Sequence, residues 1–317
     1  MAKNDKNEIK NTINLVGEVA ELELTETQTK EKGIPMFAVK CTVKFGEENY
    51  EALTFKLLCT ETNKDGQEKK SYAPMLEMFQ SIVENKLTIA DGAETPARIA
   101  VLAKFEDGFF WDADGNFKDV ATVSSSYAKL ATSKDGENKA EFLMDVYLKD
   151  IKKETIKDSD GDEEETGRLR VSGFTWDFQG RPVPFNNFVV EADLAEDFEN
   201  YYEEGAMTKL EGTWKCTQEK AASEGKGIGK KKERTFTRTE KIITYGYDPY
   251  EEDSEKYEKK IGEDAEVLRK ALKERQVLID SDERNPVNKE DSNGSVTKSS
   301  SDKESAKEKK KNAAKLF

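Results

Sequence analysis

One order of predicted elements occurs twice along this chain of 317 residues. In each copy, three strand-like segments precede a short amphipathic helix, and two further strands follow it. The first copy lies between about residues 10 and 131, and the second lies between about residues 141 and 250. The residues of the two copies hardly match, so the repeat is one of architecture rather than of sequence. This pattern limits the chain to two β-rich units of similar design.

The strand signal is clearest at Met36–Phe45, where apolar residues occupy every second position and Lys40 and Lys44 lie between them. A period of two residues is typical of a strand with one buried face. A helix that begins near Pro74 separates the third strand of this copy from the fourth, since proline is favoured in the first helical turn. The other strands of the first copy are predicted at 12–24, 50–59, 98–105 and 120–130.

The second copy repeats this order, with strands at 142–151, 169–178, 185–192, 207–216 and 236–247 and a helix at 194–203. Five strands with a helix between the third and the fourth is the layout of an OB-fold, a small barrel. The predicted fold class is therefore mainly β, with two OB-fold-like five-stranded barrels in tandem, a C-terminal helix and a disordered tail. The predicted boundaries are 1–9 for a flexible N-terminus, 10–133 and 140–250 for the barrels, 251–280 for the helix and 281–317 for the tail.

Composition supports a partly disordered chain. Hydrophobic residues make up 35% and charged residues 37% of it, against roughly 45–50% and 25% in ordinary globular proteins. No apolar run approaches the roughly 20 residues that a membrane span needs, and the N-terminus MAKNDKNEIK lacks the apolar stretch of a secretory signal. The cysteines Cys41, Cys59 and Cys216 are scattered. These features predict a cytoplasmic protein with buried thiols and no membrane partner.

The absence of histidine removes the commonest general base and the commonest metal ligand. Catalysis by Ser-His-Asp or Cys-His groups is excluded, as is a zinc site that needs imidazole. We therefore predict a protein that is not an enzyme and that holds no cofactor or metal, although carboxylate and lysine chemistry stay open. The net charge of −14 argues against a grip on phosphates unless the charge is unevenly distributed.

The charge is uneven at one loop, because lysines and glycines concentrate between the predicted fourth and fifth strands of the second copy, at 220–234. In an OB-fold this loop is one of the usual nucleic-acid-binding loops, and its cations would neutralise phosphates. The alternative is a solvated loop without a ligand. The candidate phosphate-binding residues here are Lys226, Lys230, Lys231, Lys232, Arg234 and Arg238.

A protein that binds single strands also needs exposed rings, because every base offers a flat face for stacking. By alternation, Phe174, Trp176 and Phe178 share one face of a predicted strand, although parity alone leaves open whether that face points into the barrel. In the first copy, Phe109, Phe110 and Trp111 lie near a loop tip, where they clamp a base or bury a domain contact. Further candidates are Arg168, Arg170, Arg181 and Trp214 in the second copy and Lys40, Lys44 and Lys56 in the first.

Two OB-like units, a basic loop and a tail with an apolar tip resemble the single-stranded DNA-binding proteins, particularly those of bacteriophages. The resemblance covers roughly residues 10–250. It implies a protein that coats and protects exposed strands, without sequence preference, during DNA replication, recombination and repair, in the host cytoplasm if a phage encodes it. It also implies a tail whose last residues, here Leu316 and Phe317, dock on replication or recombination proteins. The tail of that family is normally acidic, whereas KEKKKNAAKLF is basic.

Three alternatives stay open at this stage. RNA could replace DNA as the polynucleotide, since no residue type here distinguishes the two. An acidic β-rich protein-interaction module, such as a replisome adaptor or an inhibitor of a host enzyme, would meet a basic partner with its acidic surface. A metal-dependent nuclease would need carboxylates that converge on magnesium, and no spacing in the sequence shows them. Arginines near the aromatic residues favour the second barrel as the one that binds.

Overall fold

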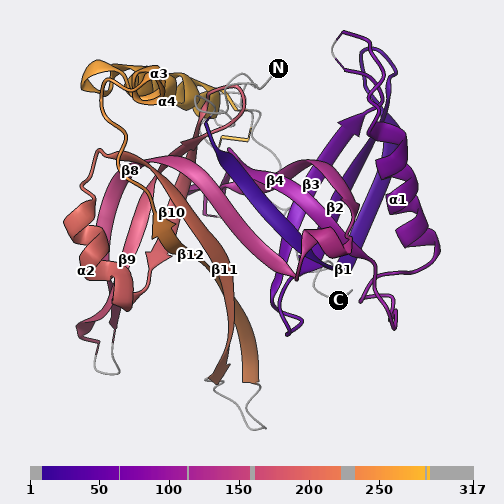
Figure 1. Cartoon of the computed structure of the whole chain (residues 1–317), viewed down its shortest axis with the longest axis horizontal. Coiled ribbons are helices and arrows are strands. Elements are labelled where there is room, and N and C mark those ends of the chain that lie inside the picture. The colour runs from indigo at the N-terminus through magenta and orange to yellow at the C-terminus, as the bar shows by residue number, and fades with distance from the viewer. Residues whose placement is uncertain are drawn as a thin grey trace, which may run out of the picture.

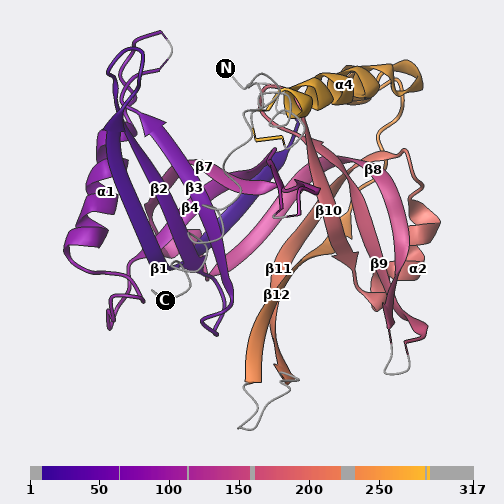
Figure 2. The same ribbon diagram turned by 180° about the vertical axis from the view of Figure 1, so that it is seen from behind.

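The computed structural model describes residues 9–63, 65–112, 114–157, 161–222, 233–282 and 284–285. Over these residues the chain is mainly β, and its helices are few and short (Figure 1). Two β-rich lobes lie side by side, and a two-stranded arm extends from one of them (Figures 1 and 2). No helix in the described ranges has the length and apolarity to cross a membrane.

The first lobe is a closed barrel of five strands. Its strands pair in the cycle β1–β2–β3–β7–β4–β1, and only β3 and β7 run parallel within it. The helix α1 (Tyr72–Glu84) lies between β3 and β4 in the sequence and buries Met75, Phe79 and Ile82. The predicted mainly β fold with a five-stranded barrel is confirmed here. The strands of this first ring are β1 (Asn11–Gln28), β2 (Pro35–Lys44), β3 (Ala52–Thr60), β4 (Arg98–Glu106) and β7 (Thr122–Leu130).

The strands of the second lobe pair in the cycle β8–β9–β10–β12–β11–β8, and β10 and β12 are parallel. A short 3₁₀ turn (Ser133–Asp135) precedes it, and α2 (Ala192–Tyr201) lies between β10 and β11. The order of elements is therefore the same in both lobes. The strands of this second ring are β8 (Lys139–Lys157), β9 (Glu163–Trp176), β10 (Pro182–Val190), β11 (Met207–Ala222) and β12 (Glu233–Gly246).

The two rings form one continuous sheet, because β1 and β8 pair with each other as antiparallel strands. The first half of β1 has β4 on one edge and β8 on the other, and β2 takes over the latter edge from Glu18 onward. At the crossover stands Gly17, where a Cβ atom would lie 2.0 Å from the carbonyl oxygen of Lys44. Only glycine permits this close approach of two backbones.

An aromatic group fills the junction between the rings. Phe105 of β4 stacks on Trp214 of β11, with ring centroids 5.8 Å apart, and Phe142 packs edge-on against both Trp214 and Phe188. Trp214 is only 5% exposed. The prediction that Trp214 stacks on a base is therefore wrong, because its ring is buried in the core. The predicted buried thiols are confirmed, since all three cysteines are free and buried.

The C-terminal helices cover one end of the second ring (Figures 1 and 2). They are α3 (Glu255–Lys260) and α4 (Glu266–Asp280), with a short 3₁₀ turn (Glu263–Ala265) between them, so the predicted C-terminal helix is confirmed. Ile261 and Leu268 from this segment pack with Met207 and Trp176 in a second apolar cluster. Trp176 is 1% exposed. The expectation that Trp176 offers a face to a base is a second error, because the helices cover it.

The structure also shows which face of β9 points into the ring, a question that alternation in the sequence left open. Val171 and Thr175, on the alternate positions of β9, are fully buried, and a Cβ on Gly173 would lie 3.0 Å from the buried Phe185 ring. The face with Phe174 and Trp176 therefore points out of the ring, but the C-terminal helices shield it.

Candidate nucleic-acid interface

In an OB-fold, the ligand crosses strands two and three between the loop that joins strands one and two and the loop that joins strands four and five. In the second ring these two loops correspond to the hairpins β8–β9 and β11–β12, and both hairpins extend beyond the body of the ring (Figure 1). In the first ring the corresponding segments are the turn at 29–34 and the segment 107–121. The latter folds into a small hairpin of β5 (Phe109–Trp111) and β6 (Phe117–Asp119).

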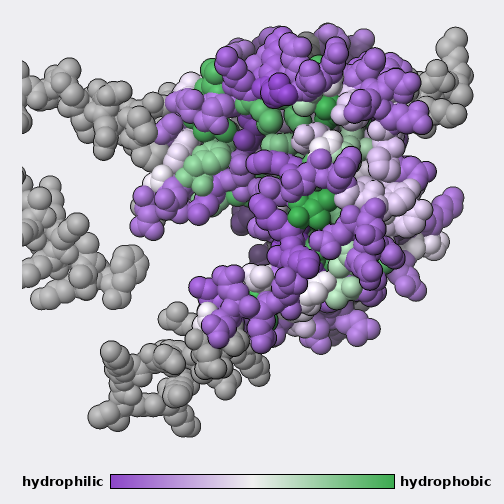
Figure 3. Space-filling view, turned by 90° about the vertical axis from the view of Figure 1, so that its left-hand side faces the viewer, coloured by the Kyte–Doolittle hydropathy of each residue, from purple (hydrophilic) through white to green (hydrophobic). Residues whose placement is uncertain are grey.

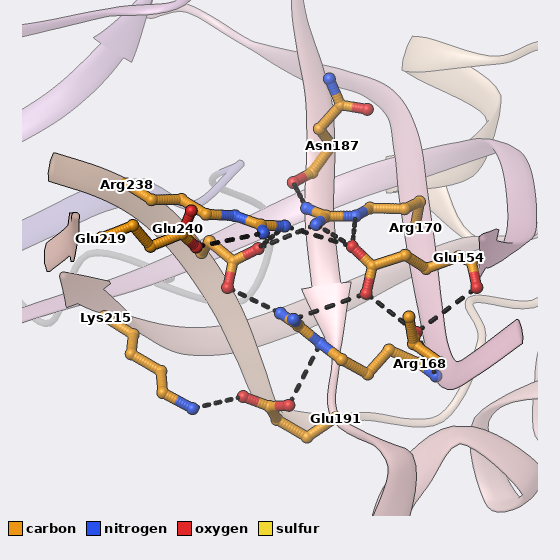
Figure 4. Close-up of polar contacts among 10 residues, drawn as sticks. Glu154, Arg168, Arg170, Asn187, Glu191, Lys215, Glu219, Arg238 and Glu240 are labelled. Atoms are coloured by element: carbon orange, nitrogen blue, oxygen red, sulfur yellow. Dashed lines mark hydrogen bonds and ion pairs between the residues drawn. The ribbon is translucent and has the colours of Figure 1, made fainter. Parts of the chain in front are cut away.

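Between the two hairpins of the second ring lies a network of arginines and glutamates (Figure 4). Arg168 and Arg170 of β9 and Arg238 of β12 converge on Glu154 of β8 and Glu240 of β12. The Nη2–Oε distances to Glu240 are 2.7 Å from Arg168 and 2.8 Å each from Arg170 and Arg238. Because the network joins three strands, it holds the bases of both hairpins together.

The network leaves its cations unequally available. Burial raises the pKa of Glu154 and Glu240, but hydrogen bonds from the arginines outweigh it, and both pKa values lie below that of a free glutamate. The carboxylates therefore stay charged and neutralise Arg168 and Arg170, whose side chains are only about one-fifth exposed. Arg238 is 43% exposed and is the most open arginine of the three. The structure thus brings three predicted residues together, and their contact with nucleic acid stays a prediction.

A second group of predicted residues lies on the turn after β9. The Asp177 carboxylate accepts hydrogen bonds from the backbone N–H of Gln179 (2.8 Å) and of Arg181 (2.9 Å) and pairs with the Arg181 guanidinium (2.7 Å). Asp177 is itself buried. The turn is therefore rigid, and it presents Phe178 to solvent at 76%, the highest exposure of any large apolar side chain in the described ranges.

One cation contacts this ring, and another lies near its turn. Lys104 of β4, in the first ring, places its Nζ 4.2 Å from the centroid of Phe178, although it also pairs with Glu106 at 3.0 Å. Lys260 of α3 lies over the turn, since a Cβ on Gly180 would come within 2.9 Å of its Nζ. We call Phe178, Lys104, Arg181 and Lys260 the junction site. Lys104 and Lys260 escaped the sequence prediction because they lie far from Phe178 along the chain.

The aromatic residues of the β5–β6 hairpin divide between its two faces. Phe109 and Trp111 pack with Phe117, with ring centroids 5.6 to 6.0 Å apart, whereas Phe110 points away and is 47% exposed. Arg284 lies over Phe109, with its guanidinium carbon 5.5 Å from the ring centroid. Phe110 is therefore the most open of the three predicted rings, and its contact with a base stays a prediction.

Helix α4 fastens this hairpin to the second ring. The Arg275 guanidinium binds Asp107 just before β5 at 2.7 Å and Asp119 at the end of β6 at 2.6 Å. Arg275 is only 12% exposed, so the ion pairs are largely shielded from water and salt. The position of the hairpin therefore depends on a helix that lies about 160 residues further along the chain.

The predicted lysines of the first ring differ in accessibility. Lys40 and Lys56 face each other across β2 and β3 and are exposed. They line a shallow groove of about 370 Å³ that also includes Leu58. Lys40 pairs with Glu23 at 3.1 Å, and Lys44 is largely covered and lies 3.9 Å from Glu18.

Several predicted residues fall outside the described part of the chain, namely Lys226, Lys230, Lys231, Lys232, Leu316, Phe317 and the side chain of Arg234. The hairpin that leads to the loop is described, and it carries one residue that sequence reasoning missed. Phe236 is 53% exposed on β12, two positions before Arg238 and so on the same strand face. The alternation of an aromatic residue and an arginine at these two positions is a signal that could have identified it.

Residues 10–285 match the sequence model of one protein family, which is described as YorF. The chain belongs to the YorF family. No curated protein sequence matches this YorF-family chain. In its described residues, no group of three or more cysteine, aspartate or glutamate side chains is placed to hold a metal ion.

Among solved structures, the YorF-family chain is similar to the wild-type single-stranded DNA-binding protein of Thermus aquaticus, with 12% identity and a TM-score of 0.41. That match covers 77% of this chain and 95% of the other. A deletion variant of the same protein matches with 13% identity and a TM-score of 0.39, over 77% and 97% of the two chains. A Replication Protein A heterotrimer bound to single-stranded DNA matches with 11% identity and a TM-score of 0.20, over 77% and 67%.

Proposed function

We propose that this protein binds single-stranded DNA without sequence preference, through two OB-folds in tandem, and has no enzymatic activity. In the manner of the phage proteins that it resembles, it would coat and protect exposed strands during replication, recombination and repair. The order of elements supports this proposal, because each ring has five strands in a closed cycle and a helix between its third and fourth strands.

The observation that carries the proposal is the exposed ring of Phe178 at the junction site. Lys104 lies over the ring, and at 76% exposure the remaining surface is open to a base. Base–aromatic stacking is worth about 1–3 kcal/mol per base and tolerates any sequence. Arg181 lies on the same turn as Phe178, and the Lys260 ammonium lies near Gly180 of that turn, so both cations are available to phosphates that flank the stacked base. The rigid turn loses little conformational entropy on binding, because Phe178 is already held in place.

Other exposed groups on both rings offer further contacts to a strand. Phe236 and Arg238 on the β11–β12 hairpin supply a ring and a cation on one strand face, and Lys40 and Lys56 line the groove of the first ring. The loop at the end of the β11–β12 hairpin would add its lysines to the backbone contacts. The net charge of −14 would disfavour the duplex, whose phosphates are denser than those of a single strand.

The test is a titration of fluorescently labelled oligo-dT with the full chain, beside a duplex of equal length, at low and high salt. We expect a rise in anisotropy with oligo-dT, a weaker one with the duplex, and loss of affinity as salt increases. An absence of any shift at low salt, or equal affinity for the duplex, would overturn the proposal. Oligo-rU in a parallel titration decides between DNA and RNA. Degradation of the oligonucleotide that needs a metal ion and survives repurification would show an enzyme instead.

A further inference from the structure

An apolar groove lies on the second ring between α2 and β12, apart from the network and the junction site. Leu194 and Phe198 from the helix and Ile243 and Tyr245 from the strand line it, together with Tyr201, and its volume is about 370 Å³. Leu194, Tyr201 and Tyr245 are 39%, 54% and 58% exposed. Large side chains with this exposure mark an interaction site when they gather around a hollow.

The groove exists because the helices of the two rings differ. In the first ring, α1 has 13 residues and buries Met75, Phe79 and Ile82 against the barrel. In the second ring, α2 has 10 residues and buries only Ala195 and Phe198. The shorter helix therefore leaves part of the β12 surface uncovered.

The rim of the groove is fixed before anything binds. The Tyr201 hydroxyl donates a hydrogen bond to Asp248, and the Tyr202 hydroxyl donates one to the carbonyl oxygen of Tyr247 at 2.7 Å. The rings of Tyr245 and Tyr247 pack edge-on with centroids 4.9 Å apart. A preformed rim lowers the entropy cost of binding, so a small contact can be productive.

The charge around the groove selects its ligand. Asp197 of α2 lines the groove, and the same helix carries three further carboxylates, Asp193, Glu196 and Glu199. The segment from 191 to 208 contains no lysine or arginine, and the next cation, Lys209, lies over the Tyr247 ring. No ion pair joins these four to a cation within the ranges that the structure describes. Figure 3 shows this side of the molecule, where small apolar patches lie within a hydrophilic surface. Such a rim repels phosphates and attracts lysine and arginine.

We propose that the groove between α2 and β12 docks a lysine- or arginine-rich segment of a partner protein, whose bulky apolar side chains enter the hollow. The apolar lining supplies the burial, and the carboxylates of α2 select basic sequences and increase the rate of association. The groove would thus give the protein a second activity, recruitment of a basic partner, that does not depend on nucleic-acid binding.

The test uses the full chain and labelled synthetic peptides in fluorescence anisotropy. The probe KKALFAKK carries the proposed chemistry, KKASSAKK lacks the apolar pair, and EEALFAEE reverses the charge. We expect binding of the first peptide only, with affinity that falls as salt rises. Equal binding of the second or third peptide would overturn the proposal, as would displacement of the probe by oligo-dT in molar equivalence.

Variants locate the site. Leu194→Ser and Tyr245→Ala should each weaken probe binding by about tenfold, the effect of losing one well-buried apolar contact. Both side chains are substantially exposed, so the fold should persist. Leu102→Ser, an equally exposed residue on the first ring, is the matched control and should bind as the wild type does. Unchanged binding in both groove variants would refute the proposal. If the probe binds only after residues 307–317 are removed, the chain's own basic segment is the occupant and a separate partner is excluded.

Discussion

Replacement of Phe178 by alanine tests the stacking surface directly. In the folded protein, the ring of Phe178 is 76% exposed, and its main defined contact is the ammonium group of Lys104. An exposed cation–π contact contributes about 0.5–1 kcal/mol, so Phe178→Ala should lower the free energy of unfolding by no more than that. The effect on DNA should be larger, because the loss of one stacked base costs about 1–3 kcal/mol.

This loss corresponds to a roughly 5- to 150-fold increase in Kd for oligo-dT. The assay is the anisotropy titration at several salt concentrations. Phe178→Ala removes no charge, so the slope of log affinity against log salt should stay that of the wild type. In contrast, Arg181→Gln should reduce this slope by about 0.7 if the guanidinium binds one phosphate of a single strand. The two variants therefore separate stacking from charge.

Leu102→Ala is the matched control, because this side chain is 53% exposed and lies on the same strand as Lys104. It should leave oligo-dT affinity unchanged. Wild-type affinity in Phe178→Ala, with an intact fold by urea unfolding, would refute the assignment of the junction site. An equal loss in Leu102→Ala would show that the effect is not specific to the ring.

Three further outcomes follow from the packing and the charges. Trp176→Ala should lower the free energy of unfolding by about 3–5 kcal/mol, since the ring is buried under α3 and α4. A urea titration measures this free energy, and a loss below about 1 kcal/mol would contradict the packing. Arg275→Met should speed amide hydrogen exchange in 107–121, because the ion pairs with Asp107 and Asp119 are lost, and this loss should destabilise the hairpin by about 1–2 kcal/mol. Unchanged exchange in this segment would show that α4 does not hold the hairpin. Glu154 has a pKa below the ordinary value of 4.5 in the folded protein, so its contribution to stability is present above that value and is lost as the pH falls through the folded-state pKa. The difference in unfolding free energy between wild type and Glu154→Gln should therefore shrink in urea titrations at acidic pH. A difference that stays constant with pH would disprove the linkage.

The periodicity of apolar residues in the sequence was sufficient to predict the strands and helices and their order. Alternation along Met36–Phe45 predicted β2, and the apolar spacing after Pro74 predicted α1. A repeat of the same order predicted a closed five-stranded barrel, because a small set of connections fits five strands and one helix. The hairpins β8–β9 and β11–β12 are longer than predicted, since polar residues in a two-stranded arm show little hydrophobic alternation.

The candidate site was predicted only in part. Phe178 and Arg181 were named because aromatic residues and arginines stand close together in sequence, and Arg238 was named as part of the basic segment. Trp176 and Trp214 were assigned wrongly because alternation gives the face of a strand but not what covers that face. Lys104 and Lys260 were missed because they reach Phe178 and its turn from β4 and α3, which lie far away along the chain.

By itself, the sequence determined that this chain builds two β-rich units of one design, that it lacks imidazole chemistry, and where its rings and cations concentrate. These are local properties, set by side-chain type and by a period of two residues along each strand. Only the tertiary structure decided that β1 and β8 join the units in one sheet, that α3 and α4 close over Trp176, and that Phe178 is largely exposed to solvent. Those outcomes depend on contacts between residues that lie far apart along the chain, and no local pattern encodes which surfaces will meet.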